Sequence, residues 1–505
     1  MSNSLRLNPS EIFSNNYRAQ DLKHTVVQGS LALMFSQGLS FGLSMVSTLV
    51  LARLLTPSDF GLIGMVTVVV NFLGMFKDAG LSTATVQNEK IDSSQISTLF
   101  WINVLLSLVL GIVILLASPL VSVFYKKPEL AAVTAVLSIS FILQGLCIQH
   151  IALLQRHLKF TTVAINDISA LIMNIVVAVV MAALGFNYWA LVGGTIASTI
   201  TLLILTFYSC PWKPGRVQKG NGVRDMMKFG GRLTVSNFVH YFSRNLDSLL
   251  IGRFIGAEPL GLYSKAFSLL MSPLNQIRAP LTTLSLPVLS SLRGEPERYQ
   301  SYYRQLLDVS ISLALPLSVY CFLEGEFLIR ILLGQQWMAA VPVFKVFSIA
   351  GVFVAMSAAP GLVMLSHGFA KRHMHLTILT AVMISVSFLI GIPFGIKGIA
   401  WGYTIASFLI MIPLISYGFR DTPIKPRLIF EAISGPLLAT SVAGVAVFIF
   451  IYSFSSDQII VHVFTGLLFL IIYVFITLLR PRTRDTLRSI WDSIVAWRKQ
   501  TSSGN

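Results

Sequence analysis

Long apolar runs separated by short polar connections fill most of the 505-residue sequence. A helix needs about 20 mostly apolar residues to cross roughly 30 Å of hydrocarbon, and runs of that length recur along the chain. We predict about fourteen spans, near residues 27–51, 60–76, 97–118, 131–153, 163–184, 189–209, 230–252, 261–289, 306–323, 339–365, 375–394, 397–418, 428–452 and 458–479. Lipid leaves an open backbone without hydrogen-bond partners, and alternating strands of about ten residues are absent, so the spans are predicted to be helices. The predicted fold class is an all-α polytopic membrane protein.

The composition supports this class. Hydrophobic residues make up 54% of the chain and charged residues only 11%, against about a quarter in soluble domains. The mean hydropathy is +0.75. The three cysteines, Cys147, Cys210 and Cys321, lie in or at the ends of apolar runs without paired spacing, so neither a disulfide framework nor a zinc site is predicted. The first two dozen residues have no apolar core, so we see no cleavable signal peptide in them.

The net charge of +16 would suggest a nucleic-acid partner in a soluble protein. Here the basic residues gather on one side of the predicted topology, which the positive-inside rule makes cytoplasmic. That side holds Arg6, Arg18, Lys23, Lys77, Lys90, Arg156, Lys159, the cluster from Lys213 to Arg232, Arg293, Arg298, Arg304, Lys371, Arg372, Arg420, Lys425, Arg427 and the tail from Arg480 to Lys499. The opposite loops carry only Arg53, Lys126, Lys127, Arg253, Arg330 and Lys397. We therefore expect both termini to be cytoplasmic and the charge to meet anionic lipid headgroups, with no nucleic acid.

Two turns of similar sequence indicate an internal repeat. The stretches VLARLLTPSDFGL (50–62) and LIGRFIGAEPLGL (250–262) align without a gap, so that Arg53 falls on Arg253, Gly61 on Gly261 and Leu62 on Leu262. Six predicted spans separate the copies, and this even number gives both the same orientation. A parallel repeat of this kind relates two lobes by an axis along the membrane normal and places a site between them.

The repeat defines the predicted domains. They are a cytoplasmic N-terminal segment (1–24), a six-span N-lobe (25–210), a cytoplasmic linker (211–228), a six-span C-lobe (229–418), two further spans (428–479) and a cytoplasmic amphipathic tail (480–505). Pro57 and Asp59 in the first copy are predicted to end one helix and to start the next with a carboxylate in its first turn. The second copy has Pro259 in place of Asp59 and carries Glu258 one residue earlier, so the acidic role shifts between the copies.

Three segments carry a resemblance to a known family. They are SQGLSFGLSMVSTLVLARLLTPSDFGLIGMVTVVVNFLGMFKDAGLSTATVQNEKIDSSQISTLFWINVLL (36–106), KFGGRLTVSNFVHYFSRNLDSLLIGRFIGAEPLGLYSKA (228–266) and FLIRILLGQQW (327–337). In combination they resemble the polysaccharide transporter (Wzx, WzxC-like) flippases of the MOP superfamily. The segments ARLLTPSDFGL and GRFIGAEPLGLYSKA are the most specific part of the match.

The resemblance implies a fourteen-helix exporter in the bacterial inner membrane. Such a protein moves undecaprenyl-pyrophosphate-linked oligosaccharide repeat units, the precursors of exopolysaccharide, capsule or lipopolysaccharide, from the inner to the outer leaflet by alternating access. Implied partners are membrane lipids, a coupled H+ or Na+, a polysaccharide polymerase and a chain-length regulator. The superfamily also contains multidrug (MATE-like) antiporters and the peptidoglycan-precursor flippase, so membership leaves the substrate open.

Charged residues in or beside the predicted spans are the candidate site residues, because a charge at the bilayer centre costs about 2.5 to 3.5 kcal/mol on insertion scales. Arg244 and Asp247 lie three positions apart on one face of the seventh predicted span, where they could form part of a site or a structural ion pair. The candidate substrate-binding residues are Arg53, Arg244, Arg253, Lys265, Arg278 and Lys345. The candidate ion-coupling or ion-pairing residues are Asp59, Asp247 and Asp308.

These candidates are biased towards cations. A cavity lined in this way would suit pyrophosphate, which Arg binds through planar bidentate hydrogen bonds. For Arg53 and Arg253 the alternative is that both side chains extend to the membrane interface, because each lies near the end of a predicted span.

The sequence contains neither a Gly-x-x-x-x-Gly-Lys-Ser/Thr loop nor a His-Glu-x-x-His motif, so we expect no cofactor, no metal and no enzymatic activity. His367, His373 and His375 fall in a basic loop whose cations would repel a metal ion. Two other functions remain open. A cation-coupled drug antiporter would need a dominant acidic residue in its cavity, and a membrane-embedded glycan polymerase or ligase would need acid and base groups on a large outer loop.

Overall fold

The computed structural model describes residues 7, 19–78, 80–88, 91–217, 241, 244–453 and 458–479. For residues 19–34, 280 and 358 it describes the backbone but not the side chains. Within these residues the regular structure is helical, without strands, which confirms the predicted all-α class. The predicted tail (480–505), most of the N-terminal segment (1–24), residues 218–228 of the linker and residues 230–240 of the seventh span lie outside the described residues.

The chain divides into two compact units, Met1–Leu262 and Tyr263–Asn505. This division falls inside a helix, whereas the predicted lobes are joined through residues 211–228. The lobe boundaries therefore remain a prediction, and the two units are described separately.

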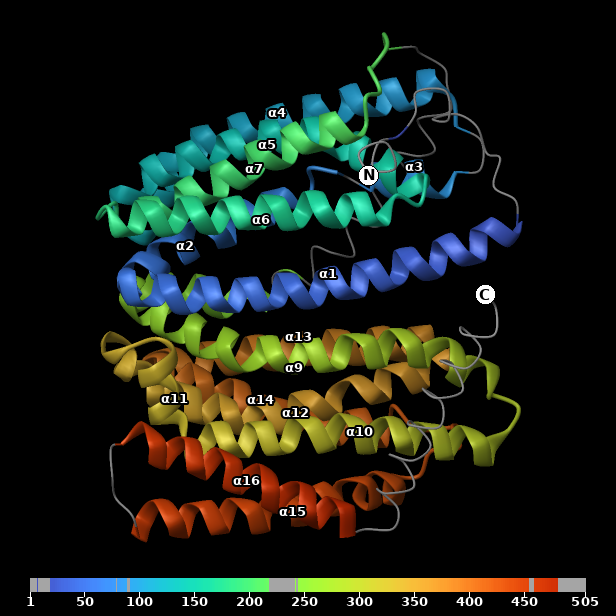
Figure 1. Cartoon of the computed structure of the whole chain (residues 1–505), viewed down its shortest axis with the longest axis vertical. Helices are drawn as coiled ribbons and strands as arrows, with labels where there is room; N and C mark the ends of the chain where they lie inside the picture. The colour runs from blue at the N-terminus through green and yellow to red at the C-terminus, as the bar shows by residue number, and fades with distance from the viewer. Residues whose placement is uncertain are drawn as a thin grey trace. The chain divides into compact units, whose positions relative to one another are not determined.

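In the first unit, the described residues between 19 and 209 form seven helices. They are α1 (Ala19–Leu54), α2 (Pro57–Gly74), α3 (Leu81–Gln87), α4 (Ser93–Tyr125), α5 (Glu129–Arg156), α6 (Phe160–Ala183) and α7 (Trp189–Ser209). Figure 1 shows α4 beside α5 and α6 beside α7, and these two pairs make the most extensive contacts of the unit. Helix α5 also packs against α2 and α7, while α1 lies along α6. Residues 244–254 form a further helical stretch.

The turn between α1 and α2 follows the predicted chemistry. Helix α1 ends at Leu54, and α2 begins at Pro57 with Asp59 in its first turn, which confirms the predicted break. Thr56 Oγ1 accepts a hydrogen bond from Asp59 N (3.3 Å), while Asp59 Oδ2 accepts from Thr56 N (2.9 Å) and Thr56 Oγ1 (2.7 Å). This capping box satisfies backbone donors that the helix itself leaves unpaired.

The two glycines of the repeat lie at one helix crossing inside the first unit. A Cβ added at Gly61 would come far closer than 3.0 Å to the carbonyl oxygen of Ala257, and one at Gly261 would do the same to the carbonyl oxygen of Pro57. The first turn of α2 therefore meets the first turn of α9 (Ala257–Ser291) backbone to backbone. Only glycine permits such a close approach.

The second unit contains the rest of α9 and the helices that follow it. These are α10 (Pro296–Leu323), α11 (Gly325–Leu332), α12 (Val341–Ser366), α13 (Ala370–Gly391), α14 (Gly395–Ser416), α15 (Pro426–Ser453) and α16 (Ile459–Leu479), with short 3-10 turns η1 (Gln335–Ala340) and η2 (Ile392–Phe394). Helix α10 packs on α12 and α15, α13 on α14, and α15 on α16. One buried cluster of this unit surrounds Tyr299 and Tyr303 of α10.

Eleven helical runs among the described residues are long and apolar enough to cross a membrane, and one of them, Ala370–Ser416, contains both α13 and α14. Helix α9 is not among these runs; it spans 35 residues and includes Lys265 and Arg278. The chain is therefore a multi-pass membrane protein. The predicted number of about fourteen spans stays a prediction.

Candidate functional site

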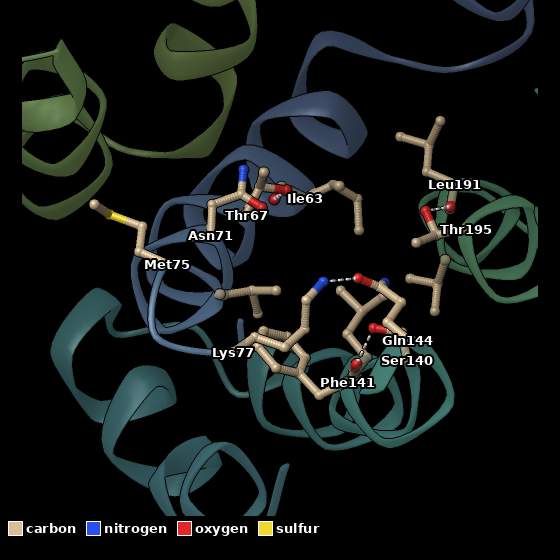
Figure 2. Close-up of a pocket in the computed structure, with 14 residues that line it drawn as sticks. Ile63, Thr67, Asn71, Met75, Lys77, Ser140, Phe141, Gln144, Leu191 and Thr195 are labelled. Atoms are coloured by element: carbon tan, nitrogen blue, oxygen red, sulfur yellow. Dashed lines mark hydrogen bonds between the residues drawn. The ribbon is translucent and has the colours of Figure 1, made fainter. Parts of the chain in front are cut away.

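A pocket opens within the first unit, between α2, α5 and α7 (Figure 2). Its volume is about 470 Å³, within the usual range for small-molecule sites. The lining residues are Ile63, Thr67, Val70, Asn71, Gly74, Met75, Lys77, Leu137, Ser140, Phe141, Gln144, Leu191, Val192 and Thr195. None of the fourteen is an Asp or a Glu. The pocket is thus mostly apolar, with several neutral polar groups and one cation.

Lys77 supplies that cation from the turn just beyond the end of α2. Its Nζ donates a hydrogen bond to Oε1 of Gln144 on α5 at 2.6 Å, and Figure 2 shows the side chain extended from α2 towards α5. The neighbouring carboxylate of Asp78 accepts hydrogen bonds from Ser82 N and Oγ, at 2.9 and 2.5 Å. Burial lowers the pKa of the Lys77 ammonium, and the charge of Asp78 acts in the opposite direction.

The hydroxyl groups of the pocket share one arrangement. Thr67 Oγ1 donates to Ile63 O, Ser140 Oγ to Leu137 O and Thr195 Oγ1 to Leu191 O, at 2.7, 2.6 and 2.9 Å. Each hydroxyl hydrogen is therefore directed to the backbone of its own helix. The oxygen lone pairs remain able to accept hydrogen bonds from a ligand.

The predicted residues of the first unit lie outside this pocket. Arg244 is exposed and Asp247 is buried. Asp247 Oδ1 accepts a hydrogen bond from Ser248 N at 2.6 Å. Among the ion pairs of the described residues, none joins Arg244 to Asp247. Nearby, the Tyr241 hydroxyl donates to Val68 O of α2 at 2.6 Å, which ties this part of the chain to α2.

Arg53 and Arg253 occupy equivalent sequence positions in different surroundings. Arg53 is exposed in the last turn of α1. The guanidinium of Arg253 lies over the rings of Phe124 and Phe254, with its Cζ 5.4 and 5.8 Å from their centres. Such cation–π contacts hold an arginine beside apolar surface.

Asp59 makes hydrogen bonds at two helix ends. Besides capping α2, its Oδ1 accepts a hydrogen bond from Tyr188 N at 3.1 Å, at the start of α7. The carboxylate therefore joins two helix ends, and 7% of the residue is exposed.

The remaining candidates belong to the second unit. Lys265 and Arg278 on α9, Asp308 on α10 and Lys345 on α12 are all partly buried. The side chain of Lys345 passes the backbone of Gly325, where an added Cβ would lie 3.1 Å from its Cγ.

Sequence reasoning missed two polar sites. Lys77 was assigned to the cytoplasmic surface by its place at the end of an apolar run, and its partner Gln144 lies 67 positions away. The second site is a buried carboxylate, Glu324, which is 3% exposed. Its Oε2 lies 2.8 Å from His462 Nδ1, and its Oε1 accepts from Thr465 Oγ1 at 2.6 Å. Polar residues within apolar runs, such as Gln144 and His462, are the signal that could have indicated both.

The fold matches that of a solved helical membrane protein. It is similar to the solved structure of the lipid II flippase MurJ in an inward closed conformation, with a TM-score of 0.72 and 14% sequence identity, over 91% of this chain and 100% of that chain. The class that the fold defines is therefore that of helical membrane proteins with this arrangement of helices.

The family follows from the sequence match. Residues 50–342 match the family described as "Polysaccharide biosynthesis protein", and the chain belongs to that family. It is 27% identical over 384 residues to the teichuronic acid biosynthesis protein TuaB of Bacillus subtilis (strain 168), covering 75% of this chain and 79% of that relative. It is 23% identical over 437 residues to the lipopolysaccharide biosynthesis protein WzxC of Escherichia coli (strain K12), covering 84% and 88%.

Proposed function

We propose that this protein is a flippase that moves lipid-linked oligosaccharide repeat units, carried on undecaprenyl pyrophosphate, across the bacterial inner membrane. Membership of the polysaccharide biosynthesis family and the fold shared with a lipid II flippase support this proposal. The observation that carries it is the pocket between α2, α5 and α7, which combines an apolar lining with neutral polar groups and one cation. The pocket offers a ligand one cation, Lys77, and the amides of Asn71 and Gln144.

An oligosaccharide that crosses the bilayer without a protein must pass a high free-energy barrier. Each sugar hydroxyl transferred from water into hydrocarbon without a new hydrogen bond costs roughly 2 to 7 kcal/mol. A polar pocket replaces part of the lost hydration while the polyprenyl chain stays in lipid. The membrane potential supplies about 2.3 kcal/mol per elementary charge per 100 mV, and its direction favours export of an anionic head group. A coupled H+ or Na+ is the other proposed energy source.

The cations are the proposed contacts of the pyrophosphate. Arg244 and Arg253 of the first unit are the first candidates, followed by Lys265 and Lys345 of the second. Arg53 and Arg278 complete the proposed set. Asp247 and Asp308 remain the candidates for ion coupling, whereas the hydrogen bonds of Asp59 favour a structural role.

The distribution of basic residues supports a setting in which both termini lie in the cytoplasm of a bacterium. The predicted domain boundaries are part of the same proposal. A polysaccharide polymerase and a chain-length regulator are the proposed partners on the pathway that receives the product.

The experiment is export of a lipid-linked oligosaccharide in proteoliposomes, measured by the access of an added glycosidase to the outer leaflet. Charge reversal at Arg244 or Lys265 is expected to abolish export while the protein remains in the membrane. The matched control is R298E, because Arg298 is an exposed arginine whose ion-pair partner among the described residues is the neighbouring Glu295. Normal export by R244E and K265E would refute the roles proposed for these cations, and no export by the unmodified protein would refute the flippase proposal.

A drug antiporter is the competing transporter. Such a protein would need a carboxylate to bind a cationic drug, and the described pocket contains a lysine but no Asp or Glu. We therefore expect no increase in drug resistance when this protein is overproduced.

A further inference from the structure

We propose that the pocket between α2, α5 and α7 is a subsite for a sugar unit that bears a single carboxylate, with Lys77 as the residue that selects the acidic sugar. This inference rests on the proposed flippase function and specifies the chemical class of its substrate. It goes beyond that function, because a lipid-linked oligosaccharide need not contain any acidic sugar.

Lys77 has hydrogen-bond donors available for a ligand. An ammonium group has three N–H donors, and Gln144 Oε1 accepts one of them. The nearby carboxylate of Asp78 is directed to Ser82 on α3. Two donors of Lys77 therefore remain for a ligand, which is enough to bind one carboxylate.

The neutral groups around Lys77 match the hydroxyls of a sugar. No hydrogen bond joins the amide of Asn71, or Nε2 of Gln144, to another residue in the described part of the chain. These amides can donate to a ligand, whereas the oxygens of Thr67 and Thr195 can accept. Sugar hydroxyls both donate and accept, so a lining of mixed donors and acceptors fits them better than it fits an inorganic anion.

The rest of the lining is apolar. Phe141 and Leu137 of α5 face the same space as Ile63 of α2. A pyranose ring presents C–H groups on its faces and hydroxyls around its edge, and so it can contact an apolar wall and polar groups at the same time. A free phosphate or pyrophosphate has no apolar face to bury there.

The charge in the pocket also favours a monoanion. Pyrophosphate carries several negative charges and is bound best by the planar fork of arginine, and the pocket has one lysine and no arginine. Lysine acts as a point charge and matches one carboxylate. The pyrophosphate of the carrier is accordingly assigned to cations outside this pocket.

The first test is binding by the purified full-length protein in detergent, with methyl glucuronoside and methyl glucoside as the probes. These two sugars differ by one carboxylate. The expected preference for the glucuronoside is about tenfold to a hundredfold, the range for one charge-assisted hydrogen bond in a partly buried site. In K77Q this preference is expected to fall to about one, with binding of the glucoside unchanged within about twofold.

Two further variants keep the test specific. K77R retains the charge and is expected to restore a preference for the glucuronoside. K397Q removes an exposed lysine of the second unit and is the matched control. Equal binding of the two probes by the unmodified protein, or an undiminished preference in K77Q, would overturn the proposal. Displacement of the glucuronoside by inorganic pyrophosphate, with a loss of pyrophosphate binding in K77Q, would assign the pocket to the carrier head group and would also overturn it.

A transport experiment distinguishes a failure of this inference from a failure of the proposed flippase function. Two polyprenyl-pyrophosphate disaccharides, one with a glucuronate and one neutral, are compared in the same proteoliposomes. The unmodified protein is expected to export the acidic substrate faster, and K77Q to export both at the slower rate. Equal rates for both substrates in both proteins would overturn the role of Lys77 and leave the flippase intact. Export of neither would refute the flippase, and the binding experiment would then decide the subsite.

Discussion

The crossing of α2 and α9 gives the most direct test of how the repeat is built. Alanine at Gly61 would place a methyl group against the carbonyl oxygen of Ala257, well inside the 3.0 Å that real Cβ contacts respect. The obstacle is backbone, so no side chain can rotate away and the two helices must separate. Gly64, one turn further along α2, is the matched control, because its added Cβ would lie 3.4 Å from Leu260 Cδ2 in ordinary contact.

The expected loss of stability combines two opposing effects. Overpacking in a tight interior typically costs about 1 to 3 kcal/mol. Replacing glycine by alanine in a helix contributes up to about 1 kcal/mol in the other direction. We therefore expect G61A to be destabilised by about 1 to 2 kcal/mol and G64A to be unchanged or slightly stabilised. For a unit of this size, 1 kcal/mol shifts the unfolding temperature by about 2 to 4 °C.

The assay is thermal unfolding of the purified protein in one detergent, with identical scan rates for all variants. G61A is expected to unfold about 2 to 8 °C below the unmodified protein. The double variant G61A/G261A is expected to lose less than the sum of the single losses, because one separation of the two helices accommodates both methyl groups. The reasoning would be refuted if G61A unfolded at the same temperature as G64A, or if the two losses were additive.

Two further predictions concern buried carboxylates. D59A removes three hydrogen bonds, two from Thr56 and one from Tyr188 N, and is expected to cost about 1 to 2 kcal/mol by thermal unfolding, with D59N intermediate; an unchanged unfolding temperature would contradict the structural role of this carboxylate. H462A removes one of the hydrogen-bond partners of the buried Glu324 carboxylate and is expected to cost about 1 to 3 kcal/mol. E324Q keeps a hydrogen-bonding side chain and is expected to cost less than H462A, so the reverse order would show that the pair does not hold α16 to α10.

Most of the long helices could be predicted because each contains an apolar run of membrane-spanning length. The predicted span 189–209 has the same bounds as α7, and the span 261–289 lies inside α9. Others are longer than predicted: α4 covers Ser93–Tyr125, whereas the apolar run suggests 97–118. Hydropathy reports the part of a helix that crosses hydrocarbon, and the helix continues into polar sequence on either side. The short helix α3 has too few residues to give such a signal.

The pocket could not be predicted, because its polar groups come from three helices that are distant in sequence. Lys77 follows an apolar run, and the positive-inside rule assigns a lysine there to the cytoplasmic surface. What gives Lys77 another role is the position of Gln144 opposite it, and that position depends on how α2 packs on α5. The hydrogen bond of the buried Glu324 carboxylate could not be predicted for the same reason, because its partner His462 is 138 positions away in the sequence.

The repeat itself separates what a sequence pattern can and cannot reveal. Gly61 and Gly261 match in sequence because both serve one backbone crossing, in which each glycine makes room for the first turn of the other helix. Arg53 and Arg253 match as well, yet one is exposed and the other lies over aromatic rings. A shared glycine thus reports a steric requirement that both copies must meet at the same contact. A shared arginine fixes only a charge near the end of a helix, and the surrounding residues of each copy determine what that charge contacts.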